Sequence, residues 1–290
     1  MSKMKIDDVK IKVNPFTWVF ILFLVLAGLY IELIDIILTV AIHEASHYFV
    51  AKKLNINMIQ IEVFPFGGAA VFDSEIFIRP DLEIIIALAG PLSNAVFIMV
   101  LIIVSQIIGT QLDYLIKINV LMCIFNLLPG VPLDGGRALK SVLSNFIGLT
   151  RANNVAVKIS YVLSLLLIYG SILMIVNGNK NYVLIAMAVF LIISARNERK
   201  LSEYFNLRDL IYKKEELFRR GVMNVRTIAV LENQKLIKII NCFLPLKYHI
   251  IVVLDKNLKE KKRLTETELF DFAIENGLYL PIGEILSKVK

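Results

Sequence analysis

The chain has 290 residues, of which 57% are hydrophobic, and a formal net charge of +7. A mean hydropathy of +0.69 argues against a purely soluble protein, and the two cysteines, Cys123 and Cys242, lie in different halves and argue against a disulfide framework. The apolar runs end near residue 195. The chain up to this residue contains 13 Lys and Arg and 12 Asp and Glu, and the chain after it contains 19 Lys and Arg and 13 Asp and Glu. These patterns predict a membrane part followed by a basic soluble part, with no motif for direct nucleic-acid binding.

Six apolar runs approach the length of a membrane-spanning helix, which needs about 20 mostly apolar residues. The fourth and sixth are short, which indicates tilted or broken helices. The first follows several lysines but has no small-residue cleavage site after it, so we expect a retained helix rather than a secretory signal. The runs are Pro15–Tyr30, Leu33–Val50, Leu82–Ile108, Tyr114–Leu128, Val155–Val176 and Tyr182–Ala195.

The charges of the connecting segments predict the orientation. Lys and Arg gather before the first run, at 52–79, at 137–158 and after residue 196, whereas the alternate connectors contribute only Lys180. Because cytoplasmic connectors carry the excess of Lys and Arg, we predict a multi-pass membrane protein with both termini in the cytoplasm. The basic soluble part is then expected near anionic cytoplasmic lipid.

The second run contains His43-Glu44-Ala45-Ser46-His47. Residues four apart lie on one face of a helix, so both imidazoles can bind one Zn²⁺, with Glu44 beside the open position as general base. In a soluble helix this pattern also arises by chance. Within an apolar run, however, three ionisable side chains are costly and usually mark function.

An alternating segment, 59–72, separates the second and third runs and is interrupted by Pro65 and Gly67-Gly68. This pattern predicts a β-hairpin. A hairpin at membrane depth needs protein or a water-filled cavity at its free edge. Beside an active site, that edge could pair with an extended peptide.

Catalytic zinc usually has three protein ligands, and no third histidine remains in the membrane part, because His249 lies in the soluble part. A carboxylate is the natural substitute. Asp134 is the best candidate, since it follows Pro129 and Pro132 at the end of the fourth run and precedes Gly135-Gly136. Asp-Gly-Gly is also a common turn sequence, so the residues alone leave both interpretations open.

The soluble part predicts the order strand, helix, strand, strand, helix. Val225–Val230 and 249–254 are the clearest strands, with a helix at Leu236–Phe243 between them. A polar turn is expected over 255–262, and Thr265-Glu-Thr-Glu268 is typical of a capping box that opens the last helix.

These motifs resemble the site-2 protease family of intramembrane metalloproteases, which pairs a membrane-embedded His-Glu-x-x-His with a later Asn-x-x-Pro-x-x-x-x-Asp-Gly. The resemblance covers residues 15–196 and implies that His43, His47 and Asp134 are zinc ligands, that Glu44 is the base, and that Asn126 holds substrate or the oxyanion. The segments 90–94 and 66–68 resemble further elements of the family. Many members have Gly where this chain has Ser46, which is also small.

The segment 223–286 resembles a single CBS motif, a module that often binds adenine nucleotides and normally works in pairs. The resemblance implies a possible ATP site and a homo-oligomer formed through this module. A generic α/β cap without a ligand is the alternative. Six spans followed by such a module resemble family members that process a pro-sigma factor precursor during sporulation, under the control of inhibitory membrane proteins.

The expected fold is therefore a polytopic α-helical membrane protein, with about six transmembrane helices and a membrane-associated β-hairpin, plus a small cytoplasmic α/β CBS-like domain. Its expected parts are a metalloprotease domain (1–196), a linker (197–222) and the CBS-like domain (223–290). One rival is a zinc transporter or metal-sensing membrane protein, which would show paired half-helix signals that we do not find. Another is a non-proteolytic nucleotide-gated adaptor, against which the intact Glu44 argues.

Overall fold

The computed structural model of the chain forms two compact units. Part of the predicted linker, the hairpin turn at Phe66 and the last residues of the chain lie outside the part that is described. The described residues are 4–6, 9–64, 67–72, 79–109, 111–178, 182–201, 213, 217–218 and 221–284. The first unit comprises Met1–Ile76, Asp81–Leu139 and Ala156–Glu198, and the second comprises Phe77–Pro80, Lys140–Val155 and Arg199–Lys290.

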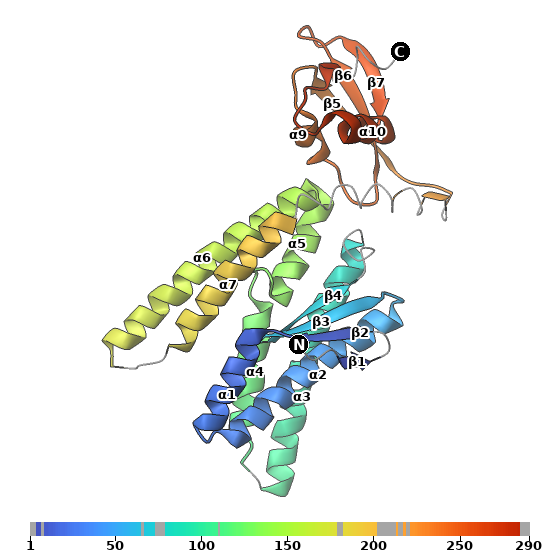
Figure 1. The fold of residues 1–290 in the computed structure, drawn as a ribbon. Helices are drawn as coiled ribbons and strands as arrows, with labels where there is room; N and C mark the ends of the chain where they lie inside the picture. The colour runs from blue at the N-terminus through green and yellow to red at the C-terminus, as the bar shows by residue number, and fades with distance from the viewer. Residues whose placement is uncertain are drawn as a thin grey trace. The chain divides into compact units, whose positions relative to one another are not determined.

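Long helices make up most of the chain before residue 202 (Figure 1). They are α1 (Pro15–Leu26), α2 (Tyr30–Lys53), α3 (Pro80–Ile108), α4 (Asp113–Leu127), α5 (Asp134–Ile147), α6 (Leu149–Val176) and α7 (Val183–Leu201). Each predicted apolar run coincides with a helix. Within the described ranges, α2, α3 and α6 are long and apolar enough to cross a membrane.

The outward surfaces of these helices are apolar. Ile103 on α3 and Leu165 on α6 are more than half exposed, as are Trp18 and Leu22 on α1. A soluble protein would bury such side chains, whereas lipid covers them at no cost. The chain is a membrane protein, and six as the number of its spans stays a prediction.

A four-stranded sheet accompanies these helices, larger than the predicted hairpin. The hairpin itself is confirmed, because β3 (Met58–Phe64) pairs antiparallel with β4 (Gly67–Phe72). The strands β1 (Met4–Ile6) and β2 (Val9–Val13) were not predicted. They form a second hairpin, and β2 pairs parallel with β3, which gives the order β1-β2-β3-β4.

A further difference from the sequence prediction is α5, which occupies what we expected to be a connector. Its first residue is Asp134, so Asp134-Gly-Gly opens a helix and is not a turn. The stretch between α4 and α5 packs against α6, where the Ser160 hydroxyl donates to the Val131 carbonyl over 3.1 Å. This contact fixes the path by which the chain enters α5.

The second unit contains the part after residue 221, here called the tail, whose predicted order of elements is confirmed. It consists of β5 (Val225–Leu231), α9 (Leu236–Ile240), β6 (Tyr248–Leu254), β7 (Glu260–Thr265) and α10 (Glu266–Asn276). β6 is central, parallel to β5 and antiparallel to β7. The predicted capping box is present, since Glu268 N–H donates to the Thr265 hydroxyl and Thr265 N–H donates to the Glu268 carboxylate.

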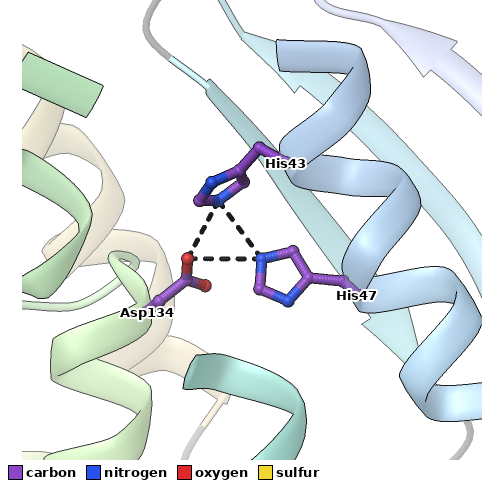
Figure 2. A group of neighbouring side chains, drawn as sticks. All are labelled: His43, His47 and Asp134. Carbon is purple, nitrogen blue, oxygen red and sulfur yellow. Dashed lines mark hydrogen bonds and ion pairs between the residues drawn. The ribbon is translucent and has the colours of Figure 1, made fainter. Parts of the chain in front are cut away.

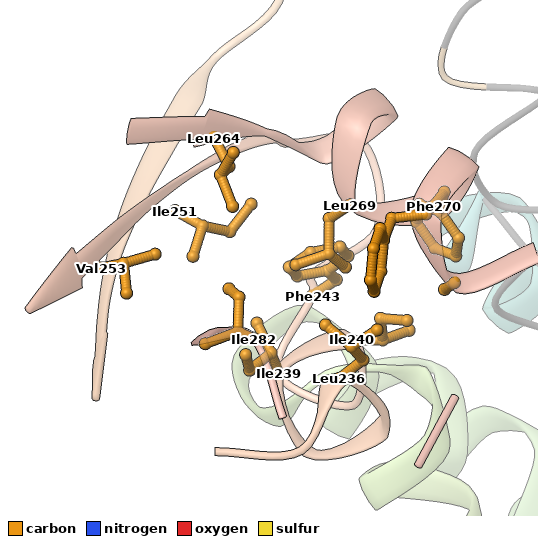
Figure 3. Packing of buried hydrophobic residues seen from close by; sticks show 12 residues of the cluster. Leu236, Ile239, Ile240, Phe243, Ile251, Val253, Leu264, Leu269, Phe270 and Ile282 are labelled. Carbon is orange, nitrogen blue, oxygen red and sulfur yellow. The ribbon is translucent and has the colours of Figure 1, made fainter. Parts of the chain in front are cut away.

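The tail has its own hydrophobic core, between the sheet and α9 and α10 (Figure 3). Alternate residues of β6 point into it, including Ile251 and Val253, which are fully buried. Phe270 of α10 and Leu236 of α9 pack against these residues in the same core. The continuous apolar run of β6 predicted a buried strand, and in the structure its burial alternates, with His249, Ile251 and Val253 buried and the residues between them half-buried.

A polar network lies beside this core. The Glu266 carboxylate accepts from His249 Nδ1 at 2.9 Å and from Lys213 Nζ at 3.0 Å. Leu244 N–H donates to His249 Nε2 at 3.1 Å, so Nε2 carries no proton and the proton lies on Nδ1. The ring is therefore neutral. Burial, the largest effect, and the Lys213 charge lower the pKa of His249 against the opposing effect of Glu266.

Candidate metal centre

Helix α2 presents two imidazoles side by side. His43 and His47 are one turn apart, and their Nε2 atoms lie 3.2 Å from each other (Figure 2). Both side chains are almost completely buried. The Nδ1 of His47 lies 2.7 Å from the Ile86 carbonyl, which can only accept, so Nδ1 carries the proton and Nε2 presents a lone pair.

The third member, Asp134, comes from the start of α5. Its Oδ2 lies 3.0 Å from His43 Nε2 and 3.3 Å from His47 Nε2 (Figure 2). The carboxylate is buried, like both histidines. The structure thus brings together two residues of one helix and a residue ninety-one positions later, which is the grouping that the sequence predicted.

Two glycines after Asp134 allow α5 to begin where it does. A Cβ on Gly135 would strike the carbonyl oxygen of Leu127, and a Cβ on Gly136 would strike the backbone of Gly130. The first turn of α5 therefore packs directly against the chain that leads into it. The two glycines are required by this close approach rather than by a turn, and the approach sets the position of the Asp134 carboxylate.

Helix α3 closes another side of the cluster through Gly90. A Cβ at this position would lie 2.6 Å from His43 Nε2 and would overlap His47 as well. The missing side chain leaves the ligand atoms of both rings free. Because Gly lowers helix stability by about 1 kcal/mol relative to Ala in a helix interior, its presence in α3 is explained by this contact.

The cluster fits a zinc ion. A tetrahedral ion with bonds of about 2.0–2.1 Å holds its ligands about 3.3 Å apart. The three observed separations, 3.0, 3.2 and 3.3 Å, are close to this value. Two imidazoles and one carboxylate are also a donor set typical of catalytic zinc with one open position, and a cation relieves the repulsion among three converging lone pairs.

Glu44 adjoins the cluster without belonging to it. As the neighbour of His43 it points about 100° away around the helix. Its side chain is buried, and neither carboxylate oxygen has a hydrogen-bond partner among the residues that the structure describes. A buried carboxylate without a protein donor is costly, so this group is placed to receive a proton from a molecule that enters the site.

Asn126 lies in the last turn of α4. Its Nδ2 donates to the Met122 carbonyl at 3.1 Å, a bond within its own helix. Among the described residues, no hydrogen bond joins its amide to the three ligands, and its contact with substrate stays a prediction. From the sequence we predicted no role for the Ile86 carbonyl or for Gly90. The resemblance of segment 90–94 to a family element was the feature of the sequence that pointed to Gly90.

Fold and site together define a helical membrane protein with a metallopeptidase-type centre: two histidines four residues apart, a carboxylate distant in sequence, and a buried glutamate beside them. Comparison with known proteins gives the family. Residues 31–114 and 105–168 match peptidase family M50. The site-2 protease from Methanocaldococcus jannaschii superposes with a TM-score of 0.57 and 31% identity, over 68% of this chain and 93% of that one.

Two relatives agree with this assignment. A zinc metalloprotease of Methanocaldococcus jannaschii is 33% identical over 171 residues, which are 57% of this chain and 48% of that protein. Stage IV sporulation protein FB of Bacillus subtilis is 28% identical over 205 residues, 70% of each protein. The matched part of this chain thus spans about half the length of the first relative. The chain belongs to peptidase family M50, the site-2 protease family.

Proposed function

We propose that this chain is an intramembrane zinc metalloprotease that hydrolyses a peptide bond in a membrane-associated protein. The observation that carries the proposal is the convergence of His43, His47 and Asp134 beside the carboxylate of Glu44, which has no hydrogen-bond partner in the described part of the chain. The presence of His43, Glu44 and His47 on α2, a helix apolar enough to cross a membrane, supports an active site within the membrane. Membership of peptidase family M50 supports the reaction type.

In the proposed mechanism, His43, His47 and Asp134 hold one zinc ion per chain. When bound, zinc lowers the pKa of a coordinated water and polarises the scissile carbonyl. Glu44 accepts the proton of the attacking water and delivers it to the leaving amine. Asn126 holds the substrate or the developing oxyanion. Burial of Glu44 strengthens its interaction with the water, because few other dipoles screen it.

The substrate must be partly unwound to expose a peptide bond, and the sheet supports a way to hold it. β4 ends the order β1-β2-β3-β4 and pairs, within the described residues, only with β3. A substrate segment in extended conformation can add to its outer edge as a further strand. The α2 helix contacts both β3 and β4, which supports a position of this edge close to the metal centre.

Cleavage of a membrane-embedded test substrate by the purified protein tests the proposal. We expect cleavage that a zinc chelator abolishes and added zinc restores. A zinc transporter or metal sensor would bind zinc without cleaving the substrate. A nucleotide-gated adaptor would show no zinc-dependent cleavage. Zinc binding without any cleavage by the intact protein would contradict the proposal.

For the substrate itself, we propose a pro-sigma factor precursor processed during sporulation. Support comes from the similarity to stage IV sporulation protein FB, together with the soluble tail after the membrane part. Both termini lie in the cytoplasm in this proposal, where such a substrate would be available, and inhibitory membrane proteins restrain the enzyme. Co-expression with a candidate precursor should yield the shortened form with the wild-type protein and not with Glu44→Gln. An unprocessed precursor would contradict this choice of substrate.

For the tail, we propose a CBS-like domain that binds an adenine nucleotide across two copies of the chain. The β-α-β-β-α order of β5 to α10 supports the module. Ile274 and Tyr279, both about two-thirds exposed, support a partner on its surface. Calorimetry of the full-length protein should show saturable ATP binding that is lost when residues 223–290 are deleted. Failure of the intact protein to bind ATP would favour a cap without a ligand.

A further inference from the structure

The two imidazoles of the metal centre differ in how they are held. The Nδ1–H of His47 donates to the Ile86 carbonyl. The Nδ1 of His43 is buried and has no hydrogen-bond partner in the part of the chain that the structure describes. Histidines that bind a metal through one ring nitrogen nearly always donate the other N–H to an oxygen, which fixes both the tautomer and the ring orientation. His43 therefore lacks an acceptor that its role requires.

Asn94 on α3 has a buried side-chain amide that lacks hydrogen-bond partners among the described residues. Its side chain is completely buried. Neither the amide oxygen nor the amide nitrogen has a partner among the described residues. Buried amide groups are almost always hydrogen-bonded in native proteins. A buried, unpartnered amide on a helix of the metal centre therefore indicates a partner that joins it when the site is loaded.

From the path of α3, we expect Asn94 to lie on the side of His43. Ile86 contacts His47, and Gly90, one turn later, faces both rings. Asn94 follows after one more turn on the same face. Helix side chains lean toward the N-terminus and cover the preceding turn, so the Asn94 amide leans over Gly90. A Cβ at Gly90 would lie 2.5 Å from His43 Cε1, the ring atom that joins Nδ1 and Nε2.

We propose that Asn94 Oδ1 accepts the Nδ1–H of His43, directly or through one water, when the metal is bound. The contact holds His43 in the tautomer whose Nε2 is free to bind zinc, as the Ile86 carbonyl does for His47. Asn94 is a positioning residue in this scheme and does not touch the substrate. The inference rests on the proposed zinc centre and adds to it a role for a residue that is neither a ligand nor the base.

Metal binding by full-length variants in detergent tests the proposal. Asn94→Leu keeps the approximate shape and removes the acceptor, whereas Asn94→Asp keeps an acceptor oxygen. The matched control is Asn119→Leu, because Asn119 is also fully buried and its Nδ2 donates to the Thr39 hydroxyl and the Leu115 carbonyl, neither of which belongs to a proposed ligand. Zinc affinity is measured by competition with a chelator. In the cobalt-loaded protein, the exchangeable imidazole N–H protons are observed by paramagnetic proton NMR in H₂O.

We expect zinc affinity to fall about 10–100-fold in Asn94→Leu, the usual effect of losing such a partner, and to be retained in Asn94→Asp and Asn119→Leu. Wild-type protein should show two shifted N–H signals, and Asn94→Leu should lose one of them to solvent exchange. Wild-type affinity and both signals in Asn94→Leu would overturn the proposal, as would an equal loss in Asn119→Leu. Should Asn94→Leu not fold, tenfold weaker zinc binding by Asn94→Asp would overturn it. If the wild-type protein binds neither metal, the zinc centre itself fails.

Discussion

The angle between neighbouring residues on α2 separates two functions, metal binding and proton acceptance. His43 and His47 share a face and converge with Asp134, whereas Glu44 points away from that face and remains unpartnered among the described residues. On a helix, a neighbour in sequence lies about 100° around the axis. The same short motif can therefore supply both metal ligands and a separate base, and substitutions should separate the two functions.

Glu44→Gln should keep the zinc and abolish the reaction. The amide preserves the shape of the side chain but cannot accept a proton, so cleavage should fall by at least the ~10²-fold contribution of a general base. His43→Ala should lose the zinc as well, because it removes a ligand. Zinc content and cleavage are to be measured on the same preparations. Near-normal cleavage by Glu44→Gln would exclude it as the base, and loss of its zinc would contradict the division of roles.

Gly90→Ala should empty the metal centre without unfolding α3. The added Cβ would overlap both imidazoles, while alanine by itself favours the helix by about 1 kcal/mol. Gly170→Ala in α6 is the matched control, because the nearest heavy atom to its Cβ would be 4.0 Å away. Metal analysis should find zinc in the control and not in Gly90→Ala. Stoichiometric zinc in Gly90→Ala would mean that the rings move aside.

At the scale of elements, α5 explains how a ligand from a distant segment reaches α2. The helix starts at Asp134, and its first turn is pressed against the preceding chain at Gly135 and Gly136. Arg137 lies one turn into α5, and its Nε is 3.8 Å from Oε1 of the buried Glu83 on α3. The helix that carries the third ligand is thus attached to the helix that carries Gly90, so the relative position of the ligands depends on two elements besides α2.

The polar network of the tail should make its stability sensitive to acid. His249 is neutral in the fold and its pKa is lowered, first by burial and also by the nearby charges of Lys213 and Arg226, against the opposing effect of Glu266. As the pH falls below about 6.5, His249 takes up a proton in the unfolded chain but remains neutral in the fold. The contribution of His249 to the stability of the fold is therefore fully present above this pH and is lost progressively below it.

Scanning calorimetry of the intact protein should show the unfolding temperature of the tail decreasing between pH 7 and pH 5. In His249→Gln, which cannot titrate, the decrease over this interval should be smaller. Glu266, whose pKa is also lowered because the bonds from His249 and Lys213 outweigh burial, adds a further loss below its ordinary pKa of 4.5. An equally steep decrease in His249→Gln would show that other groups cause it.

At the scale of the whole molecule, the sequence was sufficient to predict those features of structure and function that depend on short-range pattern. The apolar runs predicted helices, period-two alternation predicted β3 and β4, a continuous apolar run predicted β6, and Thr265 to Glu268 predicted a helix start. It was insufficient where packing between distant segments decides. β2 exists as a strand beside β3 and β1 as a strand beside β2, and α5 is a polar-faced helix whose glycines and preceding prolines indicated an irregular connector. The role of Gly90 depends on the approach of α3 to α2.

The distribution of Lys and Arg predicts that both chain ends lie in the cytoplasm. Single cysteines at positions 2 and 288, in a chain with Cys123 and Cys242 replaced by serine, should be protected from a membrane-impermeant maleimide in intact cells. A cysteine at Asn177, between α6 and α7, serves as control and should be labelled from outside. External labelling of either end would reverse the predicted orientation.

The two outer edges of the four-stranded sheet differ in composition. The strand at one edge, β1, is three residues long and contains Lys5, and its partner β2 contains Lys10 and Lys12. Short edge strands and lysines discourage pairing with another chain. The strand at the opposite edge, β4, reads Gly-Gly-Ala-Ala-Val-Phe, without charge or proline. Self-association through the sheet is therefore disfavoured at β1 and unopposed at β4, so two copies at high concentration should aggregate through the edge that is proposed to receive the substrate, and a bound substrate strand should suppress that aggregation.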